Sequence, residues 1–285
     1  MKKAKQSLPR WVWGLIVGGV IILGIAVFVV IQSPKGNPFL PANTPPPAGY
    51  VMVSPRDGMK LHYVPAGPFT MGSDAYADEQ PVHTVTLDAF WIDESEVTNQ
   101  MYSVCVADGK CMAPLPTKDV TYYDDPKFVD YPVINVRWDD AVTYCQWAGR
   151  KLPSEAQWEK AARGPNGNEF PWGNDPPSKT LVNYNNVVNG GSTSKAGEYP
   201  NGKSFYGAYD MAGNVFEWVS DWYNDTYYAS SPSYNPPGPD SGFLRGVRGG
   251  SWDNDEYFIR SATRSGARPY TWIPDIGFRC VLPAQ

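Results

Sequence analysis

Side chains that carry oxygen gather in one short stretch, DMAGNVFEW, at residues 210 to 218. Asp210, Asn214 and Glu217 supply side-chain oxygens, and Gly213 and Val215 lie in a turn that can direct backbone carbonyls inward. Calcium binds about six to eight oxygens from such a mixture of carboxylates and carbonyls. The stretch is therefore a candidate calcium site, and the alternative is an Asx-turn beside a solvated glutamate.

A second group of residues combines aromatic rings with polar neighbours near the C-terminus. It comprises WDNDEYFIR, residues 252 to 260, and SGARPYTWIPD, residues 265 to 275. Rings next to polar groups are typical of recognition surfaces. We therefore expect a binding surface here, although the rings could equally belong to the core. The rings in question are Tyr257, Phe258, Tyr270 and Trp272.

The N-terminal 50 residues differ in composition from the rest of the chain. Residues 11–31 are uncharged and almost wholly apolar, and at about 1.5 Å per residue a helix of that length spans a bilayer core of about 30 Å. A basic tail at 1–10 precedes this predicted transmembrane helix, and a proline-rich linker at 32–50 follows it. The positive-inside rule places the tail in the cytoplasm and the domain at 51–285 outside it.

Charge and cysteine content limit the partners and the compartment. The chain after residue 50 has 19 basic and 29 acidic residues, a formal charge of −10, which argues against nucleic acid as a partner. An even number of cysteines outside the cytoplasm favours disulfides, and spacing alone allows three pairings. The cysteines are Cys105, Cys111, Cys145 and Cys280.

Local patterns predict three helices and a few strands in the first half of the domain. Thr98 can cap a helix that runs to about Val106, and a second helix is expected over 139–148. Ser154 and Gln157 form a capping box for a third helix that Gly164 and Pro165 end. We also expect a hairpin over 59–73, one strand over 83–93, and a loop-rich remainder after residue 165.

Five blocks in this order resemble the formylglycine-generating enzyme family, also called the sulfatase-modifying-factor family. They are FTMGSD at 69–74, YPVINVRWDDAVTYCQWAGRKLPSEAQWEKAARG at 131–164, GAYDMAGNVFEWVSDWY at 207–223, GVRGGSWDN at 246–254 and IGFRC at 276–280. The resemblance covers roughly residues 60 to 282. It implies an α+β, C-type-lectin-like fold that is rich in loops, here preceded by the predicted transmembrane helix.

The resemblance also implies disulfides and metal sites. Cys145 and Cys280 match two family positions joined by a long-range bridge, which leaves Cys105 to pair with Cys111. One structural calcium ion is expected on the side chains of Asp210 and Glu217 and the carbonyls of Gly213 and Val215. A second family calcium site matches Asn183 and Tyr184 in its first half.

The active-site strip departs from the family pattern. Family enzymes bind Cu(I) between two thiolates, a soft metal on soft ligands, and oxidise a substrate cysteine to formylglycine. Here SWDNDEYFIRSATR, residues 251 to 264, contains no cysteine, and Asn254 stands at the position of the first thiol. Ser251, Trp252 and Arg264 match the framework, so we expect the pocket to be built without copper ligands.

Two functions follow from this pattern. The first is a membrane-anchored, extracytoplasmic member of the family that binds a protein, peptide or glycan and lacks copper-dependent oxidase activity. The alternative is a formylglycine-generating oxidase that acts on a sulfatase cysteine. A scaffold alone does not decide between them.

Overall fold

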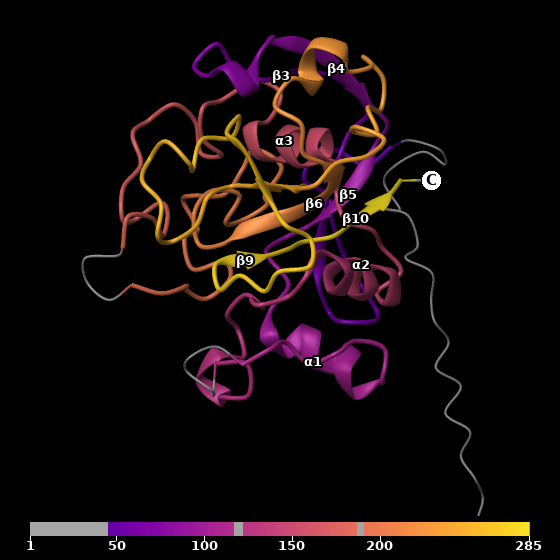
Figure 1. The fold of residues 1–285 in the computed structure, drawn as a ribbon, viewed down its shortest axis with the longest axis vertical. Helices are drawn as coiled ribbons and strands as arrows, with labels where there is room; N and C mark the ends of the chain where they lie inside the picture. The colour runs from indigo at the N-terminus through magenta and orange to yellow at the C-terminus, as the bar shows by residue number, and fades with distance from the viewer. Residues whose placement is uncertain (1–44, 117–121, 187–190, 285) are drawn as a thin grey trace, which may run out of the picture. The chain divides into compact units, whose positions relative to one another are not determined.

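The computed structural model describes residues 45–116, 122–186 and 191–284. The predicted basic tail, the predicted transmembrane helix at 11–31 and the first part of the linker lie outside these residues. No helix among the described residues is long and apolar enough to cross a membrane. Residues from Pro45 onward form one unit in which α-helices and short strands alternate with long loops (Figure 1).

One four-stranded sheet joins the two ends of the domain. Its strand order is β1 (Val51–Val53), β2 (Lys60–Val64), β5 (Phe90–Asp93) and β10 (Val281–Pro283), and all neighbours are antiparallel. Residues at the start and the end of the domain therefore share one sheet. Its edge strand β10 is bridged further to Lys151, which ties the middle of the chain to the same sheet.

A two-stranded sheet lies at the opposite end of the unit from α1 (Figure 1). It pairs β3 (Gly67–Met71) with β4 (His83–Leu87). The predicted hairpin over 59–73 is wrong, because β2 and β3 belong to different sheets. The predicted strand over 83–93 is also divided: it breaks after Leu87, and β5 continues in the four-stranded sheet. An alternating pattern cannot show where a chain passes from one sheet to another.

The three predicted helices are confirmed as α1 (Asn99–Ala107), α2 (Trp138–Trp147) and α3 (Glu155–Arg163). The Thr98 hydroxyl accepts from the N–H of Met101 and caps α1. Both hydrogen bonds of the capping box between Ser154 and Gln157 are present at the start of α3. Gly164, with φ of 67°, ends α3 in a conformation that favours glycine.

A second four-stranded sheet carries the candidate site. Its order is β8 (Arg264–Ala267), β7 (Arg245–Arg248), β6 (Phe216–Trp222) and β9 (Ile276–Gly277). β9 runs parallel to β6, whereas the other neighbours are antiparallel. Three short 3₁₀ helices complete the described elements: η1 (Ala77–Glu79), η2 (Pro126–Phe128) and η4 (Tyr227–Ser230).

Two apolar clusters hold these layers together. In the first, α1 and α2 pack through the stacked rings of Tyr102 and Tyr144, whose centroids are 5.5 Å apart. In the second, α3 contacts β6 and both strands of the β3–β4 sheet, and its Trp158 is fully buried in the cluster. α3 therefore lies between the two sheets, where its side chains reach both.

All four cysteines form disulfides, in the pairing that the resemblance implies. Cys145 of α2 is bonded to Cys280 beside β10, with Cα atoms 5.7 Å apart. Cys105 of α1 is bonded to Cys111 just beyond the same helix. The long-range bridge joins α2 to the C-terminal strand, and no free cysteine remains.

Candidate functional site

The predicted active-site strip connects β7 to β8. At its start Ser251 is fully buried, and its hydroxyl oxygen lies 3.0 Å from Asn254 Oδ1 and 3.0 Å from Asp275 Oδ2. The Ser251 N–H donates to the same amide oxygen at 2.9 Å. Two of the predicted pocket residues, Ser251 and Asn254, therefore lie together, and the Asn254 side chain stabilises the turn that the strip makes.

The turn also depends on Gly250, which has φ of 70°. A Cβ atom there would lie 2.9 Å from the carbonyl oxygen of Phe258. Only glycine adopts this conformation readily and leaves that space free. The strip therefore folds back on itself closely at the point where the buried serine begins.

Asp275 is the residue of this cluster that the sequence did not single out. Burial raises the pKa of its carboxyl group, although the hydrogen bond from Ser251 acts in the other direction. The groups around the Ser251 hydroxyl are thus an amide and a carboxyl, which are hard oxygen donors. Cu(I) prefers thiolates, so this arrangement does not suit it.

The other two pocket candidates have supporting positions. The backbone of Trp252 is bonded on both sides: its N–H donates to the Asn214 carbonyl at 3.0 Å, and its carbonyl accepts from Asn186 at 2.9 Å. Arg264 donates two hydrogen bonds, of 2.7 and 2.8 Å, to the carboxylate of Glu155. Trp252 therefore attaches the strip to two neighbouring loops, and Arg264 attaches its end to α3.

A buried ion network extends this attachment to both ends of the strip. Arg248, the last residue of β7, donates to Glu159 at 2.6 Å and to Glu155 at 3.3 Å. Burial disfavours the ionised form of Glu155, but the charge and hydrogen bonds of Arg264 together with the charge of Arg248 outweigh this effect, and the pKa of Glu155 is lowered. Arg163 adds a bond of 2.8 Å to Glu159. Two carboxylates one turn apart on α3 thus hold an arginine at each end of the strip.

All four predicted calcium ligands of the DMAGNVFEW segment are buried, but the carboxylate of Glu217 already has hydrogen-bond partners. Its two carboxylate oxygens accept from Arg279 at 2.6 Å each, and one of them also accepts from the indole N–H of Trp158 at 2.8 Å. Within the described ranges, no group of three or more His, Cys, Asp or Glu side chains converges in a way that could hold a metal ion. In this arrangement the Glu217 carboxylate forms a buried ion pair with Arg279.

Asp210 lies in a different environment, beside a second buried carboxyl group. Its Oδ2 accepts from the N–H of Gly197 at 2.6 Å, and burial raises its pKa to about 6. Burial and repulsion from Asp210 raise the pKa of Glu96. Glu96 Oε1 accepts from Asn214 at 2.9 Å, whereas its Oε2 has no hydrogen-bond partner among the described residues. Such a pair favours either a retained proton or a cation, so Asp210 fits a calcium ligand better than Glu217 does.

Sequence reasoning missed Glu96 because a glutamate two residues before a helix cap ordinarily faces solvent. Here it is fully buried. In the sequence, Glu96 is marked only by its position near the predicted helix cap at Thr98. That position does not show which loop covers the Glu96 side chain. The covering residues, Asp210 and Asn214, come from more than a hundred positions further along the chain.

Of the two residues predicted for a second calcium site, Tyr184 contacts a lysine and Asn183 does not. Asn183 donates to the Ser192 carbonyl at 3.0 Å, and its own carbonyl accepts from Asn214. The carbonyl oxygen of Tyr184 accepts from the ammonium group of Lys179, which lies 4.6 Å from the centre of the Tyr184 ring. A positive charge therefore already lies at that carbonyl, and the second calcium site stays a prediction.

The four predicted surface rings divide into two pairs. Tyr257 and Phe258 are half-buried and pack edge-on against each other, with centroids 4.8 Å apart. Tyr270 and Trp272 are exposed, by 62% and 45%, and the Arg137 guanidinium lies 5.2 Å from the centre of the Trp272 ring. The first pair packs partly within the domain, and the second pair faces solvent.

The fold and the strip together define a class of domain, and comparison with known families identifies it. Residues 49–284 match the family model described as the sulfatase-modifying factor enzyme 1-like domain. The chain belongs to this FGE-sulfatase family.

Individual relatives agree with this assignment. A formylglycine-generating enzyme of Streptomyces coelicolor is 34% identical, over 81% of this chain and 91% of the relative. The formylglycine-generating enzyme of Bos taurus is 33% identical, over 79% of this chain and 75% of that protein. Among solved structures, PvdO from Pseudomonas aeruginosa superimposes with a TM-score of 0.72 at 29% identity, over 84% of this chain and all of PvdO.

The buried carboxyl group of Asp221 makes a specific pH dependence of stability measurable. Burial is the main cause and repulsion from Glu155 the second cause that raise the pKa of Asp221 to about 7. The Glu155 N–H and the Ser220 hydroxyl donate to the carboxyl group and act in the other direction. The folded chain then keeps a proton that the unfolded chain loses near pH 4. This contribution to stability is complete below about pH 4 and disappears as the pH rises through about 7.

We expect Asp221→Asn to remove this contribution, because an amide can still accept both hydrogen bonds without titrating. The difference between the melting temperature of the variant and that of the unchanged protein should shift in favour of the variant from pH 4.5 to pH 8. Asp225→Asn, at a neighbouring exposed position, is the matched control and should follow the unchanged protein. Parallel melting curves for Asp221→Asn and the unchanged protein at the two pH values would show that Asp221 does not hold the proton.

Proposed function

We propose that this protein is a membrane-anchored, extracytoplasmic member of the FGE-sulfatase family that binds a ligand and lacks copper-dependent oxidase activity. The observation that carries the proposal is the state of the cysteines. The chain has four, and all four are paired in disulfides. Neither bridge includes a residue of the strip around Ser251, so no thiolate pair is available there for Cu(I).

The surroundings of Ser251 support the same conclusion. The hydroxyl group of Ser251 lies within hydrogen-bond distance of the side-chain oxygens of Asn254 and Asp275. The exposed rings of Tyr270 and Trp272 support ligand binding, because large rings with polar edges are frequent in recognition surfaces. The ligand class stays open among protein, peptide and glycan.

The anchor and the location are part of this proposal. The uncharged segment 11–31 and the basic residues before it support a single membrane-spanning helix with a cytoplasmic N-terminus. The two disulfides are compatible with an oxidising compartment for the domain.

The alternative, a formylglycine-generating oxidase, is favoured by the names of the relatives that this chain resembles. Both functions are tested by incubating the purified, non-reduced protein with Cu(I), oxygen and a peptide that contains a sulfatase-type cysteine. We expect no stoichiometric binding of Cu(I) and no formylglycine in the peptide by mass spectrometry. A relative named as a formylglycine-generating enzyme is the positive control. Conversion of the peptide above background would overturn the non-oxidase assignment.

We further propose a structural calcium ion at the Asp210 end of the DMAGNVFEW segment. The pair of buried carboxyl groups, Asp210 and Glu96, supports it, because a divalent cation would relieve their mutual repulsion. The carbonyls of Gly213 and Val215 are the further ligands that the resemblance implies. Glu217 is a weaker candidate in view of its bonds to Arg279.

Removal of calcium with a chelator should lower the melting temperature by several degrees, since an ion that binds only the folded state stabilises it by mass action. Asp210→Asn should reduce this shift, whereas the exposed Asp225→Asn should retain it in full. The readout is differential scanning calorimetry at pH 7.5, with and without added calcium. An identical melting temperature under both conditions would exclude the ion.

A further inference from the structure

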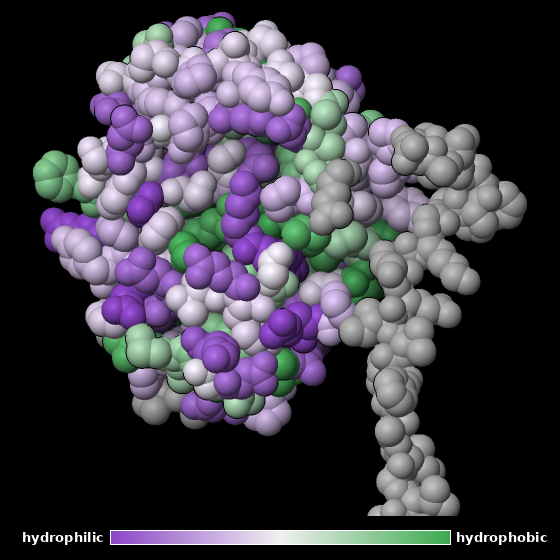
Figure 2. Space-filling model, turned by 90° about the vertical axis from the view of Figure 1, so that its right-hand side faces the viewer, coloured by the Kyte–Doolittle hydropathy of each residue, from purple (hydrophilic) through white to green (hydrophobic). Residues whose placement is uncertain are grey.

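A cavity of about 570 Å³ opens on the side of the domain formed by α2 and β10, away from the Ser251 strip. Its size is within the range usual for small-molecule sites, about 300 to 1,000 Å³. In the space-filling view of this side, hydrophobic residues lie at the bottom of a hollow with hydrophilic residues around it (Figure 2). The apolar lining comes from segments far apart in the sequence: Leu87, Ala89, Trp138, Val142, Leu152, Pro236, Pro237 and Pro283.

The aromatic wall of this cavity is fixed in place. The Trp138 indole N–H donates to the carbonyl of Val219 at 2.8 Å. The guanidinium group of Arg245 lies 3.7 Å from the centre of the same ring and 3.6 Å from the centre of the Trp222 ring. A wall that is already ordered loses little conformational entropy when a ligand binds against it.

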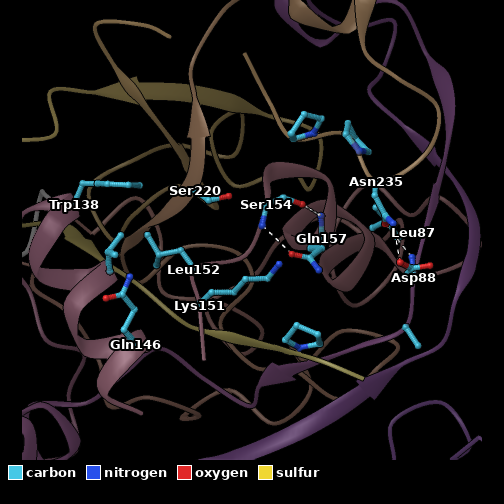
Figure 3. A pocket seen from close by; sticks show the side chains of 15 residues that line it. Leu87, Asp88, Trp138, Gln146, Lys151, Leu152, Ser154, Gln157, Ser220 and Asn235 are labelled. Carbon is cyan, nitrogen blue, oxygen red and sulfur yellow. Dashed lines mark hydrogen bonds between the residues drawn. The ribbon is translucent and has the colours of Figure 1, made fainter. Parts of the chain in front are cut away.

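Lys151 places a positive charge in this apolar setting. Its backbone is fixed by two hydrogen bonds to Val281, of 2.9 and 2.7 Å. Its side chain extends along the cavity toward Gln157 (Figure 3). In the part of the chain that the structure describes, the Lys151 ammonium group forms no hydrogen bond and no ion pair within 4.0 Å. Lys151 is an exposed residue on the lining of the cavity, so its ammonium group is available to pair with the anionic group of a ligand.

One amide lies near this ammonium group, and a second lines the cavity further away. Gln157 uses its side-chain oxygen to accept from the N–H of Ser154 at 3.0 Å, so its NH₂ group remains to donate to a ligand. Gln146, on α2, is exposed and lines the same cavity. The ammonium group of lysine and the NH₂ group of glutamine both donate hydrogen bonds to carboxylates.

The charges around the cavity also indicate how a ligand would lie. Asp88 lines the end opposite Trp138 (Figure 3). Its carboxylate is already bonded by the Tyr234 hydroxyl and by the Asn235 amide, and these bonds lower its pKa. It would repel an anion at that end. The acidic group of a ligand is therefore favoured at Lys151, with its apolar body toward Val142, Leu152 and Trp138.

We propose that this cavity binds an apolar monocarboxylic acid, with the carboxylate on Lys151 and the hydrocarbon body against the wall of α2. The same chemistry occurs in medium-chain fatty acids and in aromatic acids, which the test below distinguishes. The proposal does not depend on the chemistry at Ser251, because no residue of that strip lines the cavity.

The test is isothermal titration of the full-length protein with decanoate, below its micellar concentration, and separately with indole-3-acetate. We expect saturable binding of at least one of the two acids at a single site, and the tighter of them identifies the class. Decanol and decylamine, which have the same chain as decanoate without the negative charge, are the ligand controls. They should bind at least tenfold more weakly than the acid that binds.

Two variants connect binding to the cavity. Lys151→Gln removes the positive charge, and Gln146→Glu adds a negative charge to the lining of the cavity at an exposed position. Each should weaken binding of the acid at least tenfold, whereas Lys110→Gln, an exposed lysine far from the cavity, should leave it unchanged. Absence of binding by both acids would overturn the proposal, as would unchanged affinity in Lys151→Gln, or equal affinity for decanoate and decanol where decanoate is the acid that binds.

Discussion

The buried ion network on α3 is the interaction on which the candidate site depends. Glu155 and Glu159 lie one helical turn apart, and they bind Arg248 at the end of β7 and Arg264 at the start of β8. Both ends of the strip are thereby attached to one helix. Removing one partner from a buried pair leaves a charge that neither water nor protein neutralises, and such changes typically cost about 3 to 5 kcal/mol. The strip is consequently held in place whatever residues occupy its middle.

This separation of framework and chemistry is compatible with a chain that retains the fold of its family without the proposed copper ligands. The arginines, the double glycine and Ser251 build the turn, and Asn254 completes it with its amide oxygen. The four cysteines form two disulfides, one that joins α2 to the C-terminal segment and one that closes the loop after α1. Sulfur in this protein stabilises the scaffold, while oxygen donors line the strip, so the account predicts binding without copper chemistry.

Local sequence signals predicted the helices well, because caps and terminal glycines act within one turn. Thr98 and Ser154 cap as expected. The strands were harder, since the chain changes sheets near Asp88 with no break in its alternating pattern. The buried charges of α3 could not be predicted either, because the arginines that neutralise Glu155 lie about a hundred residues away. The same applies to Asp275, whose role appears only when the C-terminal segment returns to Ser251.

A free-thiol count tests most directly whether the protein has a thiol pair that could bind Cu(I). The purified protein is alkylated without reductant, once in its folded state and once in denaturant, and its intact mass is measured. We expect no alkylation in either case and four alkylated cysteines after reduction, with the bridges Cys105–Cys111 and Cys145–Cys280 found by peptide mapping. Two alkylated cysteines without reductant would contradict the account and restore the oxidase as the leading function.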